Sequence, residues 1–143
     1  NFFIKDPSNE NLFFQRSRVR KLILDLNKEG FNKKKLDLTV KNLKLANDGI
    51  NFYVQKNIQD NAKFIESKKT YILNKYFFKQ SEEVIFRSIP LVLKKISGRY
   101  YPPRGKSISE SILKINSAKC KKFTLGGCFI EKINETVFIT SEN

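Results

Sequence analysis

Three arginines near the N-terminus, Arg16, Arg18 and Arg20, stand at alternate positions in a chain that draws most of its positive charge from lysine. A guanidinium is a planar fork that binds two phosphate oxygens at once, whereas a lysine ammonium is a flexible point charge. The cluster therefore predicts contact with a phosphate-bearing ligand. The alternative for arginines on a helix is structural, because their stems can cover apolar surface and their heads can form salt bridges.

A second group of candidate residues lies in the segment GRYYPPRGK, residues 98–106. Two prolines stiffen this segment and lower the entropy lost when it is ordered. Its aromatic rings can stack on bases while its cations contact phosphates, which predicts a nucleic-acid contact. The alternative is that the tyrosines cover the end of the preceding helix. The group consists of Arg99, Tyr100, Tyr101, Arg104 and Lys106.

The formal net charge is +14, from 28 Lys plus Arg against 14 Asp plus Glu. Such a field favours a polyanion as partner. Lys121 and Lys122 add a basic cluster that suits phosphate contacts of low specificity. Lysine, asparagine, isoleucine and phenylalanine all have A/T-rich codons, so codon usage is an alternative source of the lysines taken singly.

The usual catalytic groups are missing from the sequence. It has no histidine, no Walker-type glycine loop and no GxSxG, which excludes triad hydrolysis and self-contained nucleotide hydrolysis. No metal site is predicted, and Cys120 and Cys128 are interpreted as reduced thiols with a structural role or none. No apolar run suits a membrane span and no signal peptide is indicated, so a cytoplasmic protein is expected.

A helix predicted over residues 9–29 positions the first arginine cluster. Ser8 or Asn9 can cap its start, and Gly30 suits its end. At about 100° per residue, Arg16 falls at the border of the apolar stripe and Arg20 just beyond it, while Arg18 points elsewhere. Arg16 and Arg20 are therefore expected to flank a buried face. That face consists of Leu12, Val19, Leu22, Ile23 and Leu26.

Further helices are predicted along most of the remaining chain. A long helix spans residues 33–60, residues 61–80 read as short strands or a strand leading into a helical turn, and a helix runs from Ser81 to Gly98 with a kink or split at Pro90. The apolar stripe of the long helix consists of Leu36, Val40, Leu43, Ala46, Ile50 and Tyr53.

The C-terminal part begins with a loop over residues 98–106. Ser107 and Glu110 form a capping-box pattern for a short helix that reaches about Lys119. Two alternating runs, 128–133 and 136–140, predict a terminal β-hairpin, with a bend or bulge at Gly126–Gly127. The fold class is therefore α+β, mainly helical.

Two segments of the sequence, in the right order, resemble one family. DPSNENLFFQRSRVRKLILDL (residues 6–26) resembles the end of the catalytic domain of tRNA(Ile)-lysidine synthases. GRYYPPRGKSISESILKI (98–115), followed by KKFTLGGCFIEKINETVFITSE (121–142), is similar to the end of the shorter members of that family. The chain starts with Asn1 and has neither methionine nor the family's Ser-Gly-Gly-x-Asp-Ser loop. It is therefore expected to be a C-terminal portion.

The resemblance implies an ATP-dependent ligase. Such an enzyme adenylates C2 of the wobble cytidine in an isoleucine tRNA with a CAU anticodon, and free lysine then displaces AMP. Residues 1–60 would be the C-terminal helices of an α/β catalytic domain with its linker, and 65–143 a small tRNA-binding domain with helices and the hairpin. ATP with Mg²⁺ would be bound mainly by the missing N-terminal part. The substrates would be tRNA(Ile), lysine and ATP, and a homodimer is compatible with the sequence.

The resemblance also assigns residues. Asp6, Pro7, Ser8 and Asn9 match the family's turn before the arginine helix. Arg16 and Arg20 are the candidate catalytic residues. Contacts to ATP or tRNA phosphates are assigned to Asn9, Arg16, Arg18 and Arg20. Contacts to tRNA are assigned to Arg87, Arg99, Tyr100, Tyr101, Arg104, Lys106, Lys121 and Lys122.

Two functions of other classes compete with this interpretation. One is a noncatalytic, basic RNA-binding or ribosome-associated module. The other is an interaction domain whose charge reflects codon usage alone.

Overall fold

The computed structural model describes residues 13–117 and 122–142, and the chain divides into two compact units, Asn1–Lys44 and Leu45–Asn143. The division falls inside α2 (Lys33–Asn61), so the two halves of this long helix belong to different units. The functional division into residues 1–60 and 65–143 stays a prediction. The predicted fold class, mainly helical α+β, is confirmed.

The first unit contains α1 (Gln15–Lys28), which begins later than the predicted start at residue 9. Phe14 is its N-cap and supplies no side-chain hydrogen bond, while Ser8 and Asn9 lie outside the described residues. The helix ends just before Gly30, as predicted, and the φ of Gly30 is +91°, in the region that favours glycine.

The apolar stripe of α1 is exposed, which contradicts the prediction of a buried face. Among the described residues nothing covers it, and its side chains are 46–61% exposed. A helical period shows which residues share a face but not whether a partner covers that face. The exposed members are Val19, Leu22, Ile23 and Leu26.

Helix α2 agrees with the predicted span, but most of its predicted apolar stripe is exposed. Asn32 caps its start, because its Oδ1 accepts from the backbone N–H groups of Lys34 at 2.9 Å and Lys35 at 3.3 Å. The buried residues are Val54 and Asn57, which continue the side of the predicted stripe four and seven residues after Ile50. The period therefore gave the correct side of the helix, but that side is buried only near the C-terminal end of α2. The exposed members of that stripe are Leu36, Val40, Leu43 and Tyr53.

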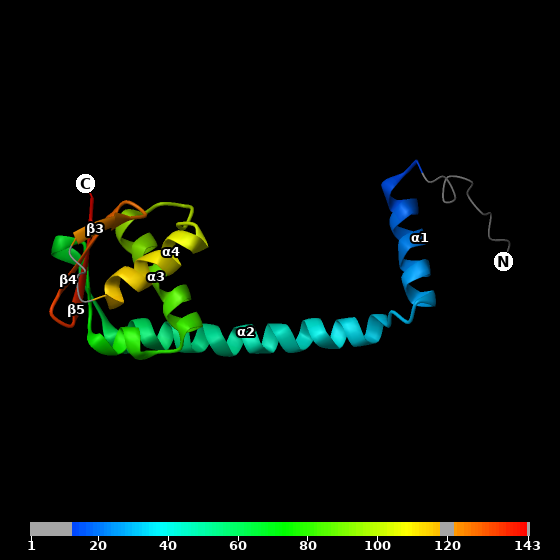
Figure 1. Ribbon diagram of the computed structural model, residues 1–143, viewed down its shortest axis with the longest axis horizontal. Coiled ribbons are helices and arrows are strands. Elements are labelled where there is room, and N and C mark those ends of the chain that lie inside the picture. Colours follow the sequence, from blue (N-terminus) through cyan, green and yellow to red (C-terminus); the bar gives the residue numbers. More distant parts are fainter. Residues whose placement is uncertain (1–12, 118–121, 143) are drawn as a thin grey trace. The chain divides into compact units, whose positions relative to one another are not determined.

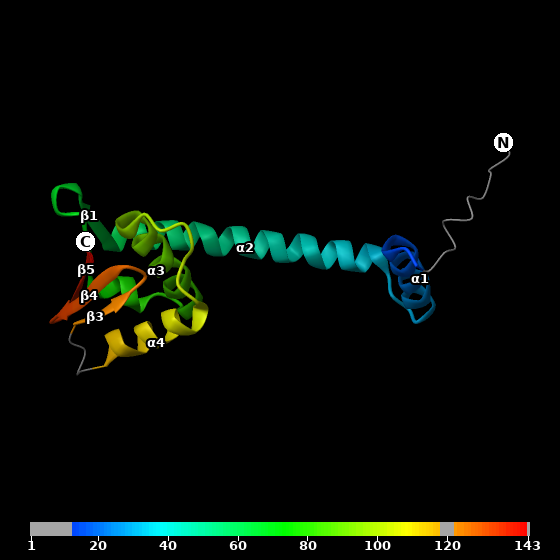
Figure 2. The ribbon, with the colours of Figure 1, turned by 90° about the horizontal axis from the view of Figure 1, so that it is seen from above.

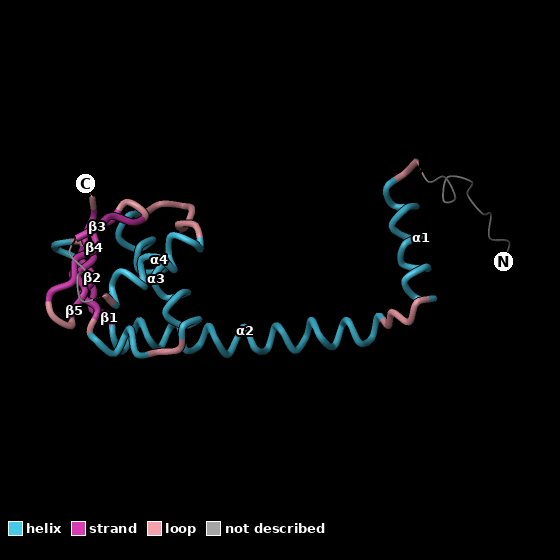
Figure 3. Tube along the Cα trace, in the orientation of Figure 1, coloured by secondary structure: helices cyan, strands magenta, loops and turns pink. Residues whose placement is uncertain are grey.

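The second unit contains one five-stranded antiparallel sheet with the order β1-β2-β5-β4-β3. The predicted hairpin is confirmed as β4 and β5, joined by Asn134–Glu135. The segment 61–80 does form two strands and helical turns (Figure 3). The strands are β1 (Ala62–Ile65), β2 (Thr70–Leu73), β3 (Lys122–Leu125), β4 (Cys128–Ile133) and β5 (Thr136–Ser141).

Strand β3 was not predicted, and it changes the role of Gly126–Gly127. The two glycines form the turn of a β3–β4 hairpin and not a bend or bulge before β4. Their φ angles are +61° and +79°. A two-residue hairpin turn of type I′ requires positive φ at both central positions, which is why two glycines stand here.

Two helices cover one face of this sheet, and both views place them on the same side (Figures 1 and 2). Helix α3 (Glu82–Ser97) continues through Pro90, so the predicted split is absent. Helix α4 (Gly105–Asn116) begins with Arg104 as N-cap, so Ser107 lies inside its first turn and does not cap it. The backbone of Arg104, which follows Pro103, is extended, and the helix begins at the next residue, Gly105.

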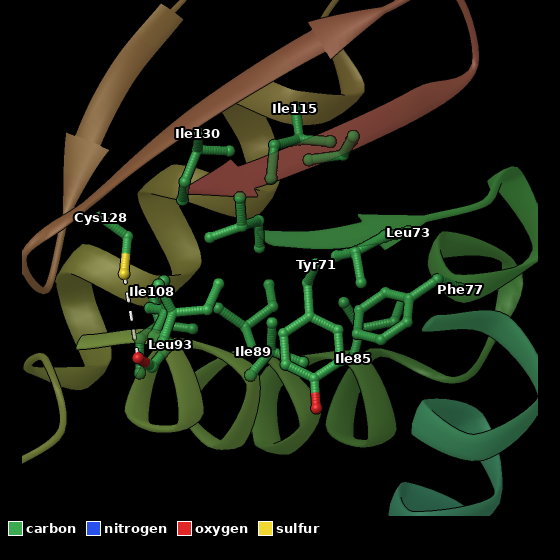
Figure 4. Packing of buried hydrophobic residues seen from close by; sticks show 14 residues of the cluster. Tyr71, Leu73, Phe77, Ile85, Ile89, Leu93, Ile108, Ile115, Cys128 and Ile130 are labelled. Atoms are coloured by element: carbon green, nitrogen blue, oxygen red, sulfur yellow. Dashed lines mark hydrogen bonds between the residues drawn. The ribbon is translucent and has the colours of Figure 1, made fainter. Parts of the chain in front are cut away.

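The core lies between the sheet and the two helices (Figure 4). The 3₁₀ helices η2 (Glu66–Lys68) and η3 (Lys75–Lys79) flank β2, and Phe77 of η3 is fully buried. The centre of the core consists of Leu73, Phe77, Ile89, Leu93, Ile130 and Ile139. None of the described helices combines the length and apolar character needed to cross a membrane.

Candidate nucleic-acid interface

The loop between α3 and α4 packs against the β3–β4 turn. A Cβ atom added to Gly127 would lie 2.6 Å from Nε of Arg99, and one added to Gly126 would lie 2.9 Å from Cγ of Pro103. The guanidinium and the proline ring therefore lie directly on the backbone of the two glycines. The segments RYYPPRG and LGG, which the sequence shows as separate motifs, form one structure.

Tyr100 and Tyr101 project from this packed loop. Their side chains are 79% and 80% exposed, so they do not cover the end of α3, and that alternative is wrong. Their ring centroids are 4.9 Å apart and their planes meet at 85°. Each ring has a face open to solvent, and an aromatic face accepts any base because every base has a π-face.

Three exposed cations lie in the same segment as the two rings. Arg99 directly precedes them, and Arg104 and Lys106 are exposed at the start of α4. Lys106 is thus on a helix and not in the predicted loop. We call Arg99, Tyr100, Tyr101, Arg104 and Lys106 the RYY surface. All five residues are exposed, in the loop and in the first turn of α4, and their contact with tRNA stays a prediction.

The other predicted RNA-binding residues lie elsewhere. Lys122 is at the end of β3 away from the turn, and its Nζ is 4.3 Å from the ring centroid of Phe129. Both side chains lie on the sheet face that α3 and α4 leave open, since the core residue Ile130 points the other way. Lys121 lies outside the described residues.

Arg87 joins two helices within the second unit. Its Nε is 2.6 Å from Oε1 of Glu83, and its Nη1 donates to the Oδ1 atoms of Asn47, at 2.5 Å, and Asn51, at 3.4 Å. These contacts tie α3 to α2. A contact of Arg87 with tRNA stays a prediction, and much of its hydrogen-bonding capacity is already used.

The arginines of α1 separate into two sides of the helix. Arg16 and Arg20, one turn apart, line a shallow depression together with Gln15 and Val19. Arg18 points away from it, and its Nη1 donates to the carbonyl oxygen of Phe13 at 2.8 Å. Asn9 lies outside the described residues. Arg18 therefore points to a different side of α1 from Arg16 and Arg20, as predicted.

A further basic group was not predicted. Lys75 and Lys79 of η3 lie beside Lys132 of β4, around a pocket at the end of the sheet. No local pattern could have found it, because the members come from distant segments that only the packing of η3 against the β4–β5 hairpin brings together.

Metal ligands and thiols are the next candidate reactive groups of the described residues. Within residues 13–117 and 122–142, no three Cys, Asp or Glu side chains gather in a way that could hold a metal ion. The Cys128 thiol is fully buried, with Sγ 3.8 Å from the carbonyl oxygen of Leu93 (Figure 4). Burial raises the pKa of this thiol, and the nearby Arg99 guanidinium opposes that shift. A neutral thiol in the core is a poor nucleophile. Cys120 lies outside the described residues.

The chain was compared with known proteins. No family model matches it. It is similar to the tRNA(Ile)-lysidine synthase of Wolbachia sp. subsp. Brugia malayi (strain TRS), with 26% identity over 99% of this chain and 33% of that protein. It is similar also to the enzymes of that name from Wolbachia pipientis wMel (24% identity, 99% of this chain, 33% of that protein) and Ruegeria pomeroyi (24%, 88%, 29%). The chain thus spans about a third of the length of these relatives, and the resemblance drawn from the motifs is confirmed.

Proposed function

We propose that this chain is the C-terminal portion of a tRNA(Ile)-lysidine synthase, in which it grips the tRNA and contributes arginines to the active site. The observation that carries the proposal is the similarity to three such enzymes over 88–99% of the chain. This similarity supports a role in tRNA modification and does not favour a noncatalytic RNA-binding module. The reaction would join lysine to C2 of the wobble cytidine at the expense of ATP, releasing AMP and pyrophosphate.

Arg16 and Arg20 are the residues we assign to phosphate contacts at the active site. They lie one turn apart on α1 and line the same depression, so both guanidinium groups can approach one polyphosphate. Rigid bidentate forks hold the charge that shifts between phosphate oxygens during nucleotidyl transfer better than ammonium groups do. The Mg²⁺–ATP complex itself would be bound mainly by parts of the enzyme that precede this chain.

The exposed stripe of α1 supports this assignment. Four large apolar side chains on one face of a helix form a patch of the kind that marks an interaction surface. We expect the rest of the catalytic domain to cover the stripe. Because Arg16 and Arg20 border it, their stems would then be held by packing at the edge of the active site.

The second unit is proposed to hold the tRNA. The RYY surface combines two highly exposed rings with three exposed cations of the same segment, which suits unpaired bases and their phosphates. The formal charge of +14 would attract the tRNA from a distance. Because the contacts are ionic, the affinity of the chain for tRNA should fall steeply with salt.

The proposal is tested by lysidine formation. A full-length protein whose last third is this chain is mixed with ATP, radiolabelled lysine and a tRNA(Ile) transcript with the CAU anticodon, and label in the tRNA is counted. We expect ATP-dependent labelling by the full-length protein. The 143-residue chain alone should bind the transcript and produce no labelled tRNA.

Lysine replacements in the full-length protein then test the arginines. Arg16→Lys combined with Arg20→Lys should lower kcat/KM by about tenfold or more, the cost of roughly one charge-assisted hydrogen bond. Arg18→Lys is the matched control, because it preserves charge on the same helix but on another side, and it should change the rate less. Undiminished labelling by the double variant would refute the role of these guanidiniums, and absence of any ATP-dependent labelling by the parent protein would refute the proposed function.

A further inference from the structure

A basic pocket lies at the end of the sheet opposite the RYY surface. Strand β4 begins directly after Gly127, against which Arg99 packs, and it ends directly before Asn134. The pocket is formed where η3 and the end of α4 meet the β4–β5 turn. We call it the η3 pocket. Its polar lining residues are Lys75, Lys79, Asn116, Lys132, Asn134 and Glu135.

The charges around the η3 pocket do not cancel. Lys75 forms an ion pair with Glu135, with 3.0 Å between Nζ and Oε2. Their hydrogen bond raises the pKa of Lys75 and lowers that of Glu135, so both are charged at neutral pH. Three lysines against one carboxylate leave two positive charges. Within the described parts of the chain, Lys79 and Lys132 have no carboxylate within salt-bridge distance.

Lys132 is held in place before any ligand arrives. Its Nζ donates to the carbonyl oxygen of Ile115, at the end of α4, at 2.7 Å, and its side chain is half-buried. An ammonium has three N–H groups, so two remain for an anion. A cation already fixed in position loses little side-chain entropy on binding.

An aromatic ring stands beside these cations. Tyr76 is 54% exposed, and the Nζ atoms of Lys75 and Lys79 lie 5.6 and 5.5 Å from its ring centroid. The combination of an exposed ring with flanking cations repeats the composition of the RYY surface. Such a combination suits a base that stacks while the neighbouring phosphate is neutralised.

We infer that the η3 pocket is a second RNA-binding site, in which Lys79 and Lys132 bind a backbone phosphate and Tyr76 stacks on an adjacent base. The inference rests on the proposed function, in which this chain holds tRNA. Six residues of β4 separate the pocket from the RYY surface, a distance of about 20 Å. One tRNA can therefore contact both sites, and the second contact becomes intramolecular once the first has formed.

Glu135 has a definite role in this arrangement. It is the carboxylate of the pocket, and it occupies one N–H of Lys75. Its removal should free Lys75 and raise the local charge from two to three. The site therefore predicts changes of opposite sign: loss of Lys79 and Lys132 weakens RNA binding, and loss of the Glu135 charge strengthens it.

The test measures binding of a tRNA(Ile) transcript by the 143-residue chain across a range of salt concentrations. Lys79→Gln combined with Lys132→Gln should reduce the slope of log affinity against log salt by about 1.4–1.8, the value for two lost phosphate contacts. Glu135→Gln should increase affinity. The controls are Lys56→Gln with Lys63→Gln and, for the carboxylate, Glu66→Gln, exposed positions elsewhere in the second unit with the same change in charge.

Equal effects of each pocket variant and its control would overturn the inference, since overall charge alone would then explain binding. In that case the proposed function would stand, because the parent chain would still bind tRNA. A parent chain that binds no tRNA at low salt would overturn both. If the lysine variant unfolds, as judged by circular dichroism, the inference is still tested by comparing the tRNA affinities of Glu135→Gln and Glu66→Gln.

Discussion

At the level of single residues, the tyrosines of the RYY surface are the most informative. Tyrosines with four-fifths of their side-chain surface exposed contribute little to the core. Their perpendicular arrangement leaves the outer faces open. Apolar surface is usually buried, so two adjacent exposed rings among cations indicate a binding role more than a folding role.

Replacing both rings tests this role. Tyr100→Leu with Tyr101→Leu should weaken tRNA binding by the chain about tenfold or more, because stacking is worth about 1–3 kcal/mol per base. Phenylalanine at both positions keeps the rings and should preserve affinity. Binding is followed by fluorescence anisotropy of a labelled transcript, with Phe52→Leu, an exposed ring on α2, as the control. Equal affinity of the leucine and phenylalanine variants would show that stacking is not involved.

At the level of elements, the loop between α3 and α4 depends on a turn that follows it in the sequence. The β3–β4 turn requires two glycines for two reasons. Both positions have positive φ, and the close approach of Arg99 and Pro103 leaves no room for a Cβ atom. Packing of this kind orders the loop without covering the tyrosines. The position of Arg99 is thus set by strand pairing.

A comparison of Gly127→Ala with Gly98→Ala separates the requirement for positive φ from the requirement for space. The Cβ added to Gly127 would be strained by the positive φ, costing about 1–2 kcal/mol, and would also displace the Arg99 side chain. Gly98→Ala meets a φ of +64° with open space around the Cβ, so it carries the backbone cost alone. We expect similar losses of stability in urea unfolding, and weaker tRNA binding only for Gly127→Ala. If the two variants bind tRNA equally, the turn does not position the arginine.

At the level of the whole chain, the second half of α2 is part of the second unit through a polar contact. Asn57 is 2% exposed, and its Nδ2 donates to the carbonyl oxygen of Phe77 and to Oγ of Ser88, both at 3.3 Å. Its Oδ1 accepts from Nδ2 of Asn61 at 3.0 Å. One side chain thus connects α2, η3 and α3, and no buried side-chain polar atom of the described residues lacks a partner.

Asn57→Ala should therefore destabilise the second unit. The substitution leaves the Phe77 carbonyl without this donor in the core and should reduce the free energy of unfolding by about 1–3 kcal/mol. Gln55→Ala, at an exposed position on the same helix, should stay within about 0.5 kcal/mol of the parent. Urea unfolding followed by circular dichroism provides the comparison. A neutral Asn57→Ala would mean that α2 is held to the unit by other contacts.

Local patterns were enough for the features that neighbouring residues control. The span of α2, the β4–β5 hairpin with its Asn134–Glu135 turn, and the directions of Arg16, Arg18 and Arg20 all follow from a repeat of 3.6 or 2 residues. Such repeats depend on backbone geometry and side-chain polarity close by in the chain. For the same reason, the quoted motifs could indicate the family before any contact was known.

Long-range packing decided the rest. Strand β3, the extent to which the apolar side of α2 is buried, the packing of Arg99 on Gly127 and the meeting of Lys79 with Lys132 depend on residues far apart in sequence. No local repeat carries that information, because the burial of a face depends on which element comes to cover it. Asn57 is an example: it is a polar residue on the apolar side of α2, and its hydrogen bonds with η3 and α3 make it part of the core.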